Sequence, residues 1–380
     1  MKICIFSLAL HTNYGGILQA YALQTVLQRM GHEVIVINKI LTPSKPRLIE
    51  IIKRMILKIL GRDVVVFSER KRIREAPIVN KSLLDFRRKY IHEVFIDKLC
   101  DIRQYDIDCI VVGSDQIWRA KYFKEQWSEQ MENAFLSFTK GWNVKRISYA
   151  ASFGVNEWDF DNAETERILD AIKQFNAVSV REESGVNLLR DKQIDSKVVL
   201  DPTLLLSKDD YVKLFETAHV PQSKGNILVY LLDPKESQKR VINKLEAETH
   251  LVSFFVNNKG ISETAPVEDR ILPSVETWLR GFYDAEYIIT DSFHACVFSI
   301  IFNKPFVVFG NKVRGLSRFE SLLSQLGLAS RLVDDNATPN DVIDILLSKD
   351  ISTNISSNMQ EILEHKKDLS MKYLNDALCV

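Results

Sequence analysis

Residues 2–37 read KICIFSLALHTNYGGILQAYALQTVLQRMGHEVIVI, and they alternate short apolar runs with a glycine turn and a helical pattern. The apolar run 3–6 predicts a strand, Gly15 and Gly16 follow in a turn, and residues 17–30 carry apolar side chains at helical spacing. The run 34–37 is continuously apolar and β-branched, which is typical of a parallel strand covered on both faces. This order predicts a βαβ unit.

The same alternation of short apolar runs and turns recurs along the rest of the chain. Short apolar runs, each followed by a polar or glycine-containing turn, occur at 109–112, 147–150, 177–180 and 198–200. After the polar stretch 207–224, further candidate strands occur at 227–232, 251–256, 287–289 and 306–309. We therefore predict an α/β protein with two Rossmann-like doubly wound domains facing a cleft, whose functional loops gather at the carboxyl ends of the strands. The predicted N-terminal domain covers residues 1–220 and the C-terminal domain covers residues 221–350. A C-terminal helix is predicted within 351–380, and the sequence does not show which domain it packs against.

The composition excludes several classes of protein. A chain of 380 residues is long enough for two domains, and 46% hydrophobic with 26% charged residues excludes disordered and low-complexity classes. Fifty basic and fifty acidic residues leave a formal charge of zero, which argues against a dedicated nucleic-acid binder. Five scattered cysteines without a CxxC pair predict reduced thiols. With no apolar stretch suited to a signal peptide or a membrane span, we expect a cytoplasmic location.

Residues 285–306, AEYIITDSFHACVFSIIFNKPF, carry the most chemical information. A strand ends near Thr290 and an apolar helix follows, so that His294 lies in the first turn of that helix. Free backbone N–H groups and the helix dipole favour an anion there. The dipole lowers the pKa of a histidine, whereas a bound phosphate raises it more strongly, and a protonated His294 beside a phosphate is our hypothesis. The alternative is that His294 only makes hydrogen bonds within the first turn of its helix and binds no ligand.

Six blocks in this order resemble the polysaccharide pyruvyl transferase family. They are NYGGILQAYALQ at 13–24, VGSDQIW at 112–118, SYAASFG at 148–154, SVRE at 179–182, DPTLL at 201–205, and residues 290–306. The resemblance covers about residues 1 to 335. It implies a fold like that of two-domain GT-B glycosyltransferases and transfer of pyruvate from phosphoenolpyruvate to a sugar as a ketal. Phosphoenolpyruvate would be a co-substrate, and the scheme needs no other cofactor and no metal.

Two residues match the family's functional positions. His294 resembles its catalytic histidine, and Arg181 resembles an arginine that holds the donor's phosphate or carboxylate. Many members place an arginine two residues before that histidine, whereas this chain has Ser292 and then Phe293 as donor-side residues. The departure leaves open which donor is used, or how it is held.

A substitute for the missing arginine is available in the loop after the strand 306–309. Arg314 and Arg318 both carry a planar fork that suits a carboxylate or phosphate. We prefer Arg318 as the second anion ligand. The alternative is that both are solvated surface arginines.

The N-terminal domain is expected to bind the acceptor. Residues 13–16 lie between a strand and a helix and could hold a sugar or its diphosphate, the alternative being a turn without ligand. Asp115 and Gln116 could orient hydroxyls, and Trp118 either stacks on a sugar ring or packs in the core. The predicted acceptor-binding residues are Asn13, Tyr14, Gly15, Gly16, Asp115, Gln116 and Trp118.

Residues 48–60 form a local amphipathic stretch. Apolar residues at 48, 51, 52, 55, 56, 59 and 60 lie on one helical stripe, and Lys53, Arg54 and Lys58 lie off it. Between residues 45 and 74 there are ten basic and three acidic residues, a surplus of seven. The pattern fits a helix lying on an anionic membrane near a polyprenyl-diphosphate-linked sugar. The alternative is a helix packed on its own domain with solvated lysines.

The leading prediction is a pyruvyltransferase that moves pyruvate from phosphoenolpyruvate to a hexose of a capsule, exopolysaccharide or lipid-linked precursor. A glycosyltransferase that uses a nucleotide sugar is the alternative within the same fold, which the Ser292 departure keeps open. A non-catalytic sugar-binding protein is a third possibility.

Overall fold

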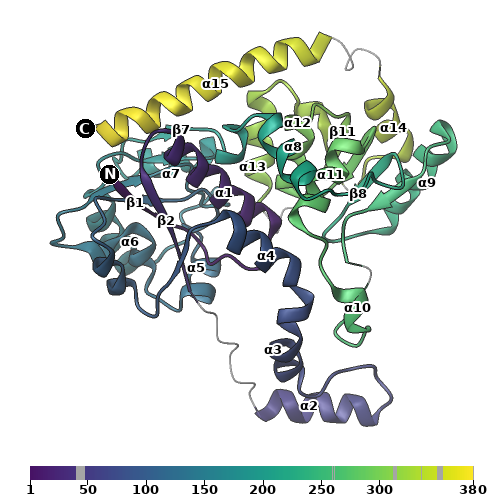
Figure 1. Ribbon diagram of the computed structural model, residues 1–380, viewed down its shortest axis with the longest axis horizontal. Helices are drawn as coiled ribbons and strands as arrows, with labels where there is room; N and C mark the ends of the chain where they lie inside the picture. Colours follow the sequence, from purple (N-terminus) through teal and green to yellow (C-terminus); the bar gives the residue numbers. More distant parts are fainter. Residues whose placement is uncertain are drawn as a thin grey trace.

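Two five-stranded parallel sheets form the two halves of the computed structural model (Figure 1). It describes residues 1–39, 48–258, 260, 262–310, 315–334, 336–348 and 354–379. The first sheet has the order β3-β2-β1-β4-β5 and the second β12-β11-β10-β8-β9. Their strands are β1 (Lys2–Phe6), β2 (Glu33–Asn38), β3 (Glu93–Phe95), β4 (Cys109–Val112), β5 (Lys145–Ser148), β8 (Ile227–Tyr230), β9 (Ser253–Phe255), β10 (Tyr287–Thr290), β11 (Phe306–Phe309) and β12 (Leu332–Val333). The predicted α/β class with two parallel, Rossmann-like sheets is confirmed.

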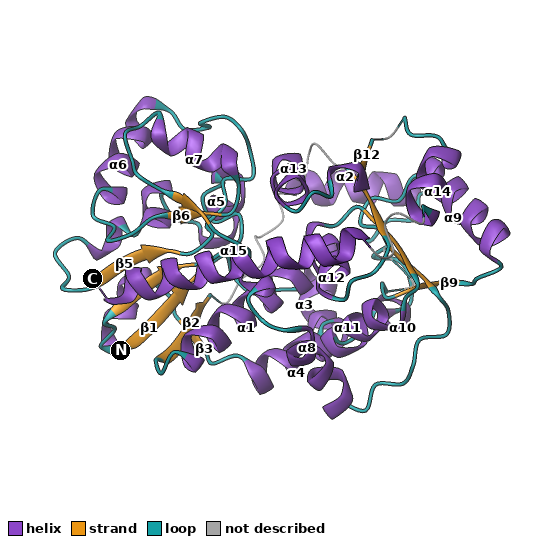
Figure 2. Ribbon diagram, turned by 90° about the horizontal axis from the view of Figure 1, so that it is seen from above, coloured by secondary structure: helices purple, strands orange, loops and turns teal. Residues whose placement is uncertain are grey.

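Helices cover both faces of the sheets (Figure 2). The helices of the first half, which include two that project from the body, are α1 (Tyr14–Arg29), α2 (Leu48–Ile59), α3 (Ser68–Val79), α4 (Lys81–Tyr90), α5 (Ala120–Trp127), α6 (Asn162–Ile172) and α7 (Glu183–Arg190). The later helices are α8 (Lys208–Thr217), α9 (Glu236–Thr249), α10 (Val267–Arg270), α11 (Val275–Asp284), α12 (Phe293–Ile301), α13 (Leu316–Gln325), α14 (Pro339–Leu347) and α15 (Asn354–Cys379).

Strand β1 shows why its run is apolar throughout. Ile3 and Ile5 point into one core, which α1 shares, while Cys4 and Phe6 point into a second core on the other face. All four side chains are fully buried. Because alternate residues of a strand face opposite sides, burial on both faces requires an unbroken apolar run.

The chain passes between the halves near residue 200. The short strands β6 (Ser179–Val180) and β7 (Lys197–Val198) pair with each other, and bridges at Ala177 and Val180 join β6 to the first sheet. Helix α8, which the predicted boundary at residue 220 assigns to the first domain, packs against α11, and Tyr211 meets Phe298 of α12 edge-on at 4.9 Å. Helix α8 therefore lies with the second sheet.

The C-terminal helix α15 returns to the first half of the molecule (Figures 1 and 2). Tyr373 donates to the carbonyl of Ser148 at 2.9 Å, and Ser370 accepts from the backbone N–H of Leu200 at 3.0 Å. The side chain of Leu374, which belongs to α15, is fully buried. These contacts settle the docking that the sequence left open.

Helices α2 and α3, residues 48–79, project from the body, and we call them the arm (Figure 1). Arg54 of α2 donates two hydrogen bonds of 2.8 Å to Glu69 of α3, and Arg72 pairs with Glu263 of the second half at 2.9 Å. Helix α2 buries none of its residues and contacts α3 through Arg54, so it is not part of the core of its domain. Of the helices in the described part of the chain, none combines the length and the apolar character that a membrane span needs.

Candidate active site

A cavity of about 380 Å³ lies where the carboxyl ends of the two sheets face each other. Loops after β1, β4 and β6 line it from the first half, and α12 and α13 line it from the second. Ligands bind at this edge in doubly wound sheets. The predicted site residues along its wall are Asn13, Gly16, Asp115, Gln116, Arg181, Ser292, Phe293, His294 and Arg318.

His294 lies in the first turn of α12 and reaches the first half of the molecule. Strand β10 ends just before it, where the N–H of Ser292 donates to Oγ1 of Thr290 at 3.0 Å. The imidazole packs on Gly15 so closely that a Cβ at this position would lie 2.0 Å from Nδ1 of His294. Its Nε2 lies 3.7 Å from Oδ2 of Asp201. Gly15 therefore serves the close approach of the histidine rather than binding an acceptor directly.

Asp201 is the buried anion beside this histidine. Its Oδ2 accepts from Gln19 Nε2 at 2.5 Å and from Arg181 Nη1 at 2.8 Å, and its Oδ1 accepts from Thr203 Oγ1 at 2.7 Å. Burial acts to raise the pKa of Asp201, but His294, Arg181 and the hydroxyl of Thr203 outweigh burial and hold the pKa well below its ordinary value. Asp201 is ionised, accepts a hydrogen bond from Arg181 and lies beside the ring of His294.

The pKa of His294 is lowered from its ordinary value. Burial is the main cause, the neighbouring Asp201 opposes it, and the charges of Arg181 and Arg318 lower the pKa further. The first turn of α1, where Gly15 lies, also points at the ring. Without an anion in the cavity the imidazole is neutral at pH 7. A bound group with two negative charges would shift the pKa back upward.

Two arginines enclose the ring of Phe293. The guanidinium carbon of Arg181 lies 4.7 Å from the ring centroid, and that of Arg318 lies 5.0 Å from it. Both side chains are buried, and burial, with a contribution from the charge of Arg181, lowers the pKa of Arg318 to about 9. Nε and Nη2 of Arg181 have no hydrogen-bond partner among the described residues. Paired guanidinium groups of this kind are typical of a site for a carboxylate or phosphate.

The structure thus places Arg318, the preferred substitute for the missing arginine, on the same ring as Arg181. Arg314, the other candidate, lies outside the described residues.

The wall formed by the first half has a different character. Asn13 caps α1 by accepting from the N–H of Gly15 at 3.0 Å, and Gln116 accepts from Arg119 at 3.1 Å. Asp115 accepts from the N–H of Leu8 at 3.0 Å through Oδ2. Polar atoms of cavity residues that find no hydrogen-bond partner within the described ranges include Asp115 Oδ1, Gln19 Oε1, Gln126 Oε1 and His11 Nε2. Three of these four are oxygen acceptors, which suit the hydroxyl donors of a sugar.

Two predicted acceptor residues lie elsewhere. Trp118 is fully buried, stacks on Phe135 with the ring centroids 4.8 Å apart, and donates to the carbonyl of Ala134, so its predicted contact with a sugar is wrong and it is a core residue. Tyr14 stacks on Trp278 at 5.5 Å and donates to the carbonyl of Pro273 at 2.7 Å. Tyr14 therefore joins the two halves and does not line the cavity.

Four site residues were not predicted from the sequence, namely Asp201, Gln19, Gln126 and His11. Asp201 comes three residues after β7 and directly precedes a proline, which is a usable signal for a functional loop. Gln19 stands within an otherwise apolar helix run, where a buried amide needs a partner.

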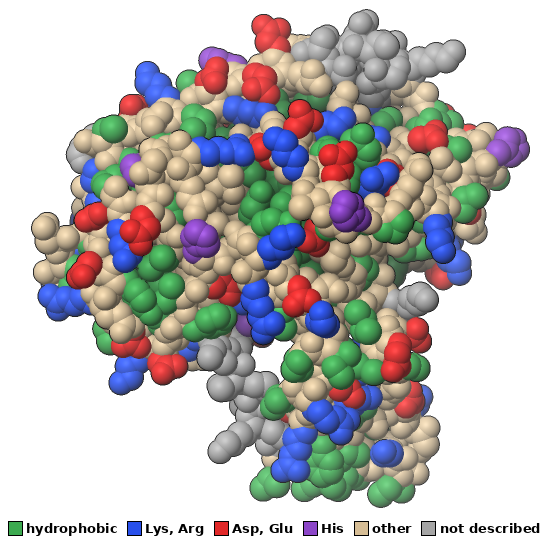
Figure 3. All heavy atoms as spheres, in the orientation of Figure 1, with side chains coloured by type: hydrophobic (Ala, Val, Ile, Leu, Met, Phe, Trp, Pro, Cys, Tyr) green, Lys and Arg blue, Asp and Glu red, His purple; other side chains and the backbone are tan. Residues whose placement is uncertain are grey.

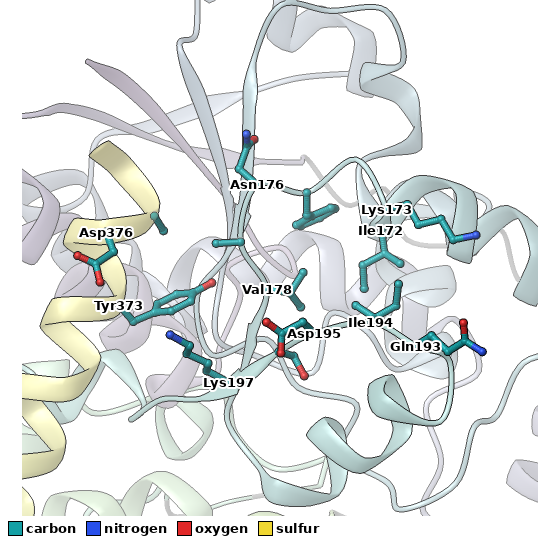
Figure 4. A pocket seen from close by; sticks show the side chains of 14 residues that line it. Ile172, Lys173, Asn176, Val178, Gln193, Ile194, Asp195, Lys197, Tyr373 and Asp376 are labelled. Carbon is teal, nitrogen blue, oxygen red and sulfur yellow. The ribbon is translucent and has the colours of Figure 1, made fainter. Parts of the chain in front are cut away.

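A second cavity of about 470 Å³ lies between α15 and the segment from α6 to β7 (Figure 4). It is at the amino ends of β6 and β7, the edge opposite the first cavity. Its charged lining residues are Lys173, Lys197, Asp195 and Asp376, and no histidine or arginine lines it. Although this cavity is larger, the convergent buried cations favour the first as the active site.

Comparison with known proteins identifies relatives at two levels. The profile of the family described as polysaccharide pyruvyl transferase matches residues 13–313. A search of the curated proteins found no match.

Among solved structures, the chain is similar to UDP-GlcNAc 2-epimerase from Neisseria meningitidis bound to UDP-GlcNAc, with 12% identity and a TM-score of 0.53 over 100% of both chains. It is also similar to Arabidopsis thaliana UGT89C1 complexed with UDP, with 9% identity and a TM-score of 0.52 over 100% of both chains. Both likenesses concern the fold alone, which is of the GT-B type with two Rossmann-like domains.

Proposed function

Because the chain belongs to the polysaccharide pyruvyl transferase family, we propose that it moves pyruvate from phosphoenolpyruvate to a hexose of a surface polysaccharide or its lipid-linked precursor. Two hydroxyls of the sugar replace phosphate at the central carbon of the donor and close a ketal. The paired buried arginines on Phe293 beside His294 carry this proposal.

The two buried arginines support the proposal that phosphoenolpyruvate is the donor. Phosphoenolpyruvate carries a carboxylate and a phosphate, and Arg181 and Arg318 present two guanidinium forks to one cavity. Asp201 and Glu182 are buried anions near these cations, and a bound anion that contacts both guanidinium groups would further offset their mutual repulsion. The backbone N–H groups at the start of α12 add to the same attraction.

His294 supplies the proton in this scheme. Binding of the phosphate raises the pKa of the imidazole, so the donor itself recruits the acid form. The protonated ring gives its proton to the methylene carbon, and the positive charge that develops at the central carbon is met by a sugar hydroxyl. Gly15 and Asp201 fix the ring in place from the other half of the molecule.

The test is a calorimetric titration of phosphoenolpyruvate into the wild type, Arg318→Ala and the control Arg190→Ala. Arg190 is exposed and bonds only to Asn187 among the described residues, so its variant should bind like the wild type. Loss of a charged hydrogen-bonding partner at Arg318 should weaken binding about 10- to 100-fold. Arg318 suits the test better than Arg181, whose removal would also leave Asp201 unpaired.

Absence of both heat and thermal stabilisation with phosphoenolpyruvate would overturn the donor assignment. Saturable binding of a UDP-hexose under the same conditions would instead favour the alternative, a nucleotide-sugar glycosyltransferase.

The arm supports a peripheral membrane contact close to a lipid-linked acceptor. Its helix α2 exposes Leu48 by 78%, Ile59 by 84% and Ile52 by 53%, and Figure 3 shows apolar side chains gathered at the tip with basic side chains beside them. An apolar helix face flanked by lysine and arginine matches an anionic lipid surface.

Flotation with vesicles of phosphatidylglycerol tests this contact. Wild type should float with them and should float less with purely zwitterionic vesicles, and Ile52→Glu with Ile56→Glu should abolish flotation. Phe255→Glu is the matched control, since Phe255 is equally apolar and 62% exposed but lies in β9 on the body. Flotation that survives both arm substitutions would remove the membrane contact.

A further inference from the structure

We propose that Asp115 is a second catalytic residue, the base that takes the proton from the attacking sugar hydroxyl. The inference rests on the proposed function and adds to it a proton acceptor on the wall opposite His294. It assigns Asp115 a chemical step rather than only the orientation of hydroxyls.

The proton balance of ketal formation calls for such a group. Two hydroxyls each lose a proton, one proton ends in the new methyl group, and the other ends on the released phosphate. His294 gives its proton to the methylene carbon when the first hydroxyl attacks the central carbon and a C–O bond forms. At that moment the hydroxyl proton needs a separate acceptor, because the imidazole is giving up its own proton to the methylene carbon in the same step.

A cycle with two groups closes without any other reactant. Asp115 takes the first hydroxyl proton and returns it to the phosphate as the C–O bond to phosphate breaks. The second hydroxyl then adds to the central carbon, and its proton restores the imidazolium of His294. Both residues end in the state in which they began.

The position of Asp115 suits this role. It follows β4 in the loop at the carboxyl edge of the first sheet and lines the cavity that also contains His294. The N–H of Leu8 donates to Oδ2 at 3.0 Å and holds the carboxyl group in place. Oδ1 is buried and makes no hydrogen bond of good geometry among the residues that the structure describes, although the N–H of Ile117 also acts on the carboxylate. Buried polar atoms usually have a hydrogen-bond partner, so this oxygen suits a further donor supplied by a ligand.

The electrostatic surroundings agree with this geometry. Burial raises the pKa of Asp115 to about 7, the charge of Arg181 and the backbone N–H groups of Leu8 and Ile117 oppose the rise, and the charge of Asp201 adds to it. The other charged or titratable groups among the residues given for this cavity are His11, Tyr122, Arg181, Asp291, His294 and Arg318. Asp291 differs from Asp115 because both of its carboxylate oxygens accept from backbone N–H groups, those of Leu232 and Asp233. A base works best with a pKa near the working pH, because it can then both take up and release a proton, as the proposed role of Asp115 requires.

The experiment measures phosphate release from phosphoenolpyruvate by the wild type, Asp115→Asn and Asp376→Asn. The acceptors are a panel of nitrophenyl hexosides, together with water, whose slow attack on the donor needs the same base. Asparagine keeps the shape and the bond to Leu8, so the melting temperature should be no lower than that of the wild type and the phosphoenolpyruvate affinity should stay within twofold of it. Asp376 is exposed on α15, and its variant controls for the loss of one carboxylate.

We expect Asp115→Asn to lower turnover about 100- to 10,000-fold and to remove the fall in rate that the wild type shows as the pH drops below about 7. Turnover within threefold of wild type, or an unchanged acid limb, would overturn the assignment. A wild type that neither binds nor consumes phosphoenolpyruvate would instead overturn the proposed function, and the two failures are therefore distinguishable.

Discussion

Replacing Gly15 by alanine should disable the site through the histidine rather than through the turn. An added Cβ would lie 2.0 Å from Nδ1, 2.4 Å from Cγ and 2.5 Å from Cε1 of His294. Carbon atoms in contact need about 3.5 Å, so the ring must move by more than about 1 Å. The ring cannot swing aside freely, because the residue is buried and its neighbour Phe293 contacts both Arg181 and Arg318.

The expected magnitude follows from this displacement. Overpacking of a buried site costs about 1–3 kcal/mol of unfolding free energy, and a misplacement of about 1 Å costs about 100-fold in rate. Urea denaturation measures the first quantity, and phosphate release from phosphoenolpyruvate measures the second. The chemical shifts of His294 in protein with labelled histidine report the movement directly.

Gly16→Ala is the matched control. A Cβ on Gly16 would meet no atom nearer than Asn13 Nδ2 at 3.9 Å, and alanine in a helix is favoured over glycine by about 0.5–1 kcal/mol. This variant should be at least as stable as the wild type and should leave the shifts of His294 unchanged. Wild-type rate and stability in Gly15→Ala would refute the steric reasoning.

Three further variants test other parts of the structure. Asp115→Asn should be more stable than wild type by about 1–4 kcal/mol at pH 8.5, but not at pH 4. The reason is that the folded pKa of Asp115 is about 7 against an ordinary 3.8, so the wild type loses stability as the pH rises between these values. Urea denaturation at both pH values measures the difference. Trp118→Ala should lose about 3–5 kcal/mol in urea denaturation while the folded fraction keeps its KM for acceptor, since the side chain is in the core. Tyr14→Phe should lose about 1 kcal/mol through its bond to Pro273, again without a change in the acceptor KM.

The fold was predictable because its signals are local. Each central strand is buried on both faces and must be apolar throughout, and parallel strands place their following loops at one edge. The family resemblance, rather than this local logic, singled out Arg181 and His294, and both line the same cavity.

The partners of the histidine were harder to predict, because they depend on how the two halves dock. Nothing in the local sequence indicates that the glycine at position 15 faces a ring 279 residues later, or that Asp201 supplies the nearby charge. Trp118 and Tyr14 illustrate the converse, since an aromatic residue beside a functional motif can be there for packing alone. Whether such a residue packs or binds depends on its tertiary contacts, which no periodicity in the sequence reveals.

The return of α15 to the first half has a consequence for biosynthesis. The carbonyl of Ser148 and the N–H of Leu200 find their partners in Tyr373 and Ser370, which follow 225 and 170 residues later in the chain. Domains of a nascent chain commonly fold in order from the N-terminus, but here the first half stays incomplete until α15 has been synthesised and released. A ribosome that stalls late would therefore hold a first half with an uncovered apolar face, and a truncated product should aggregate or be degraded rather than persist as a folded fragment.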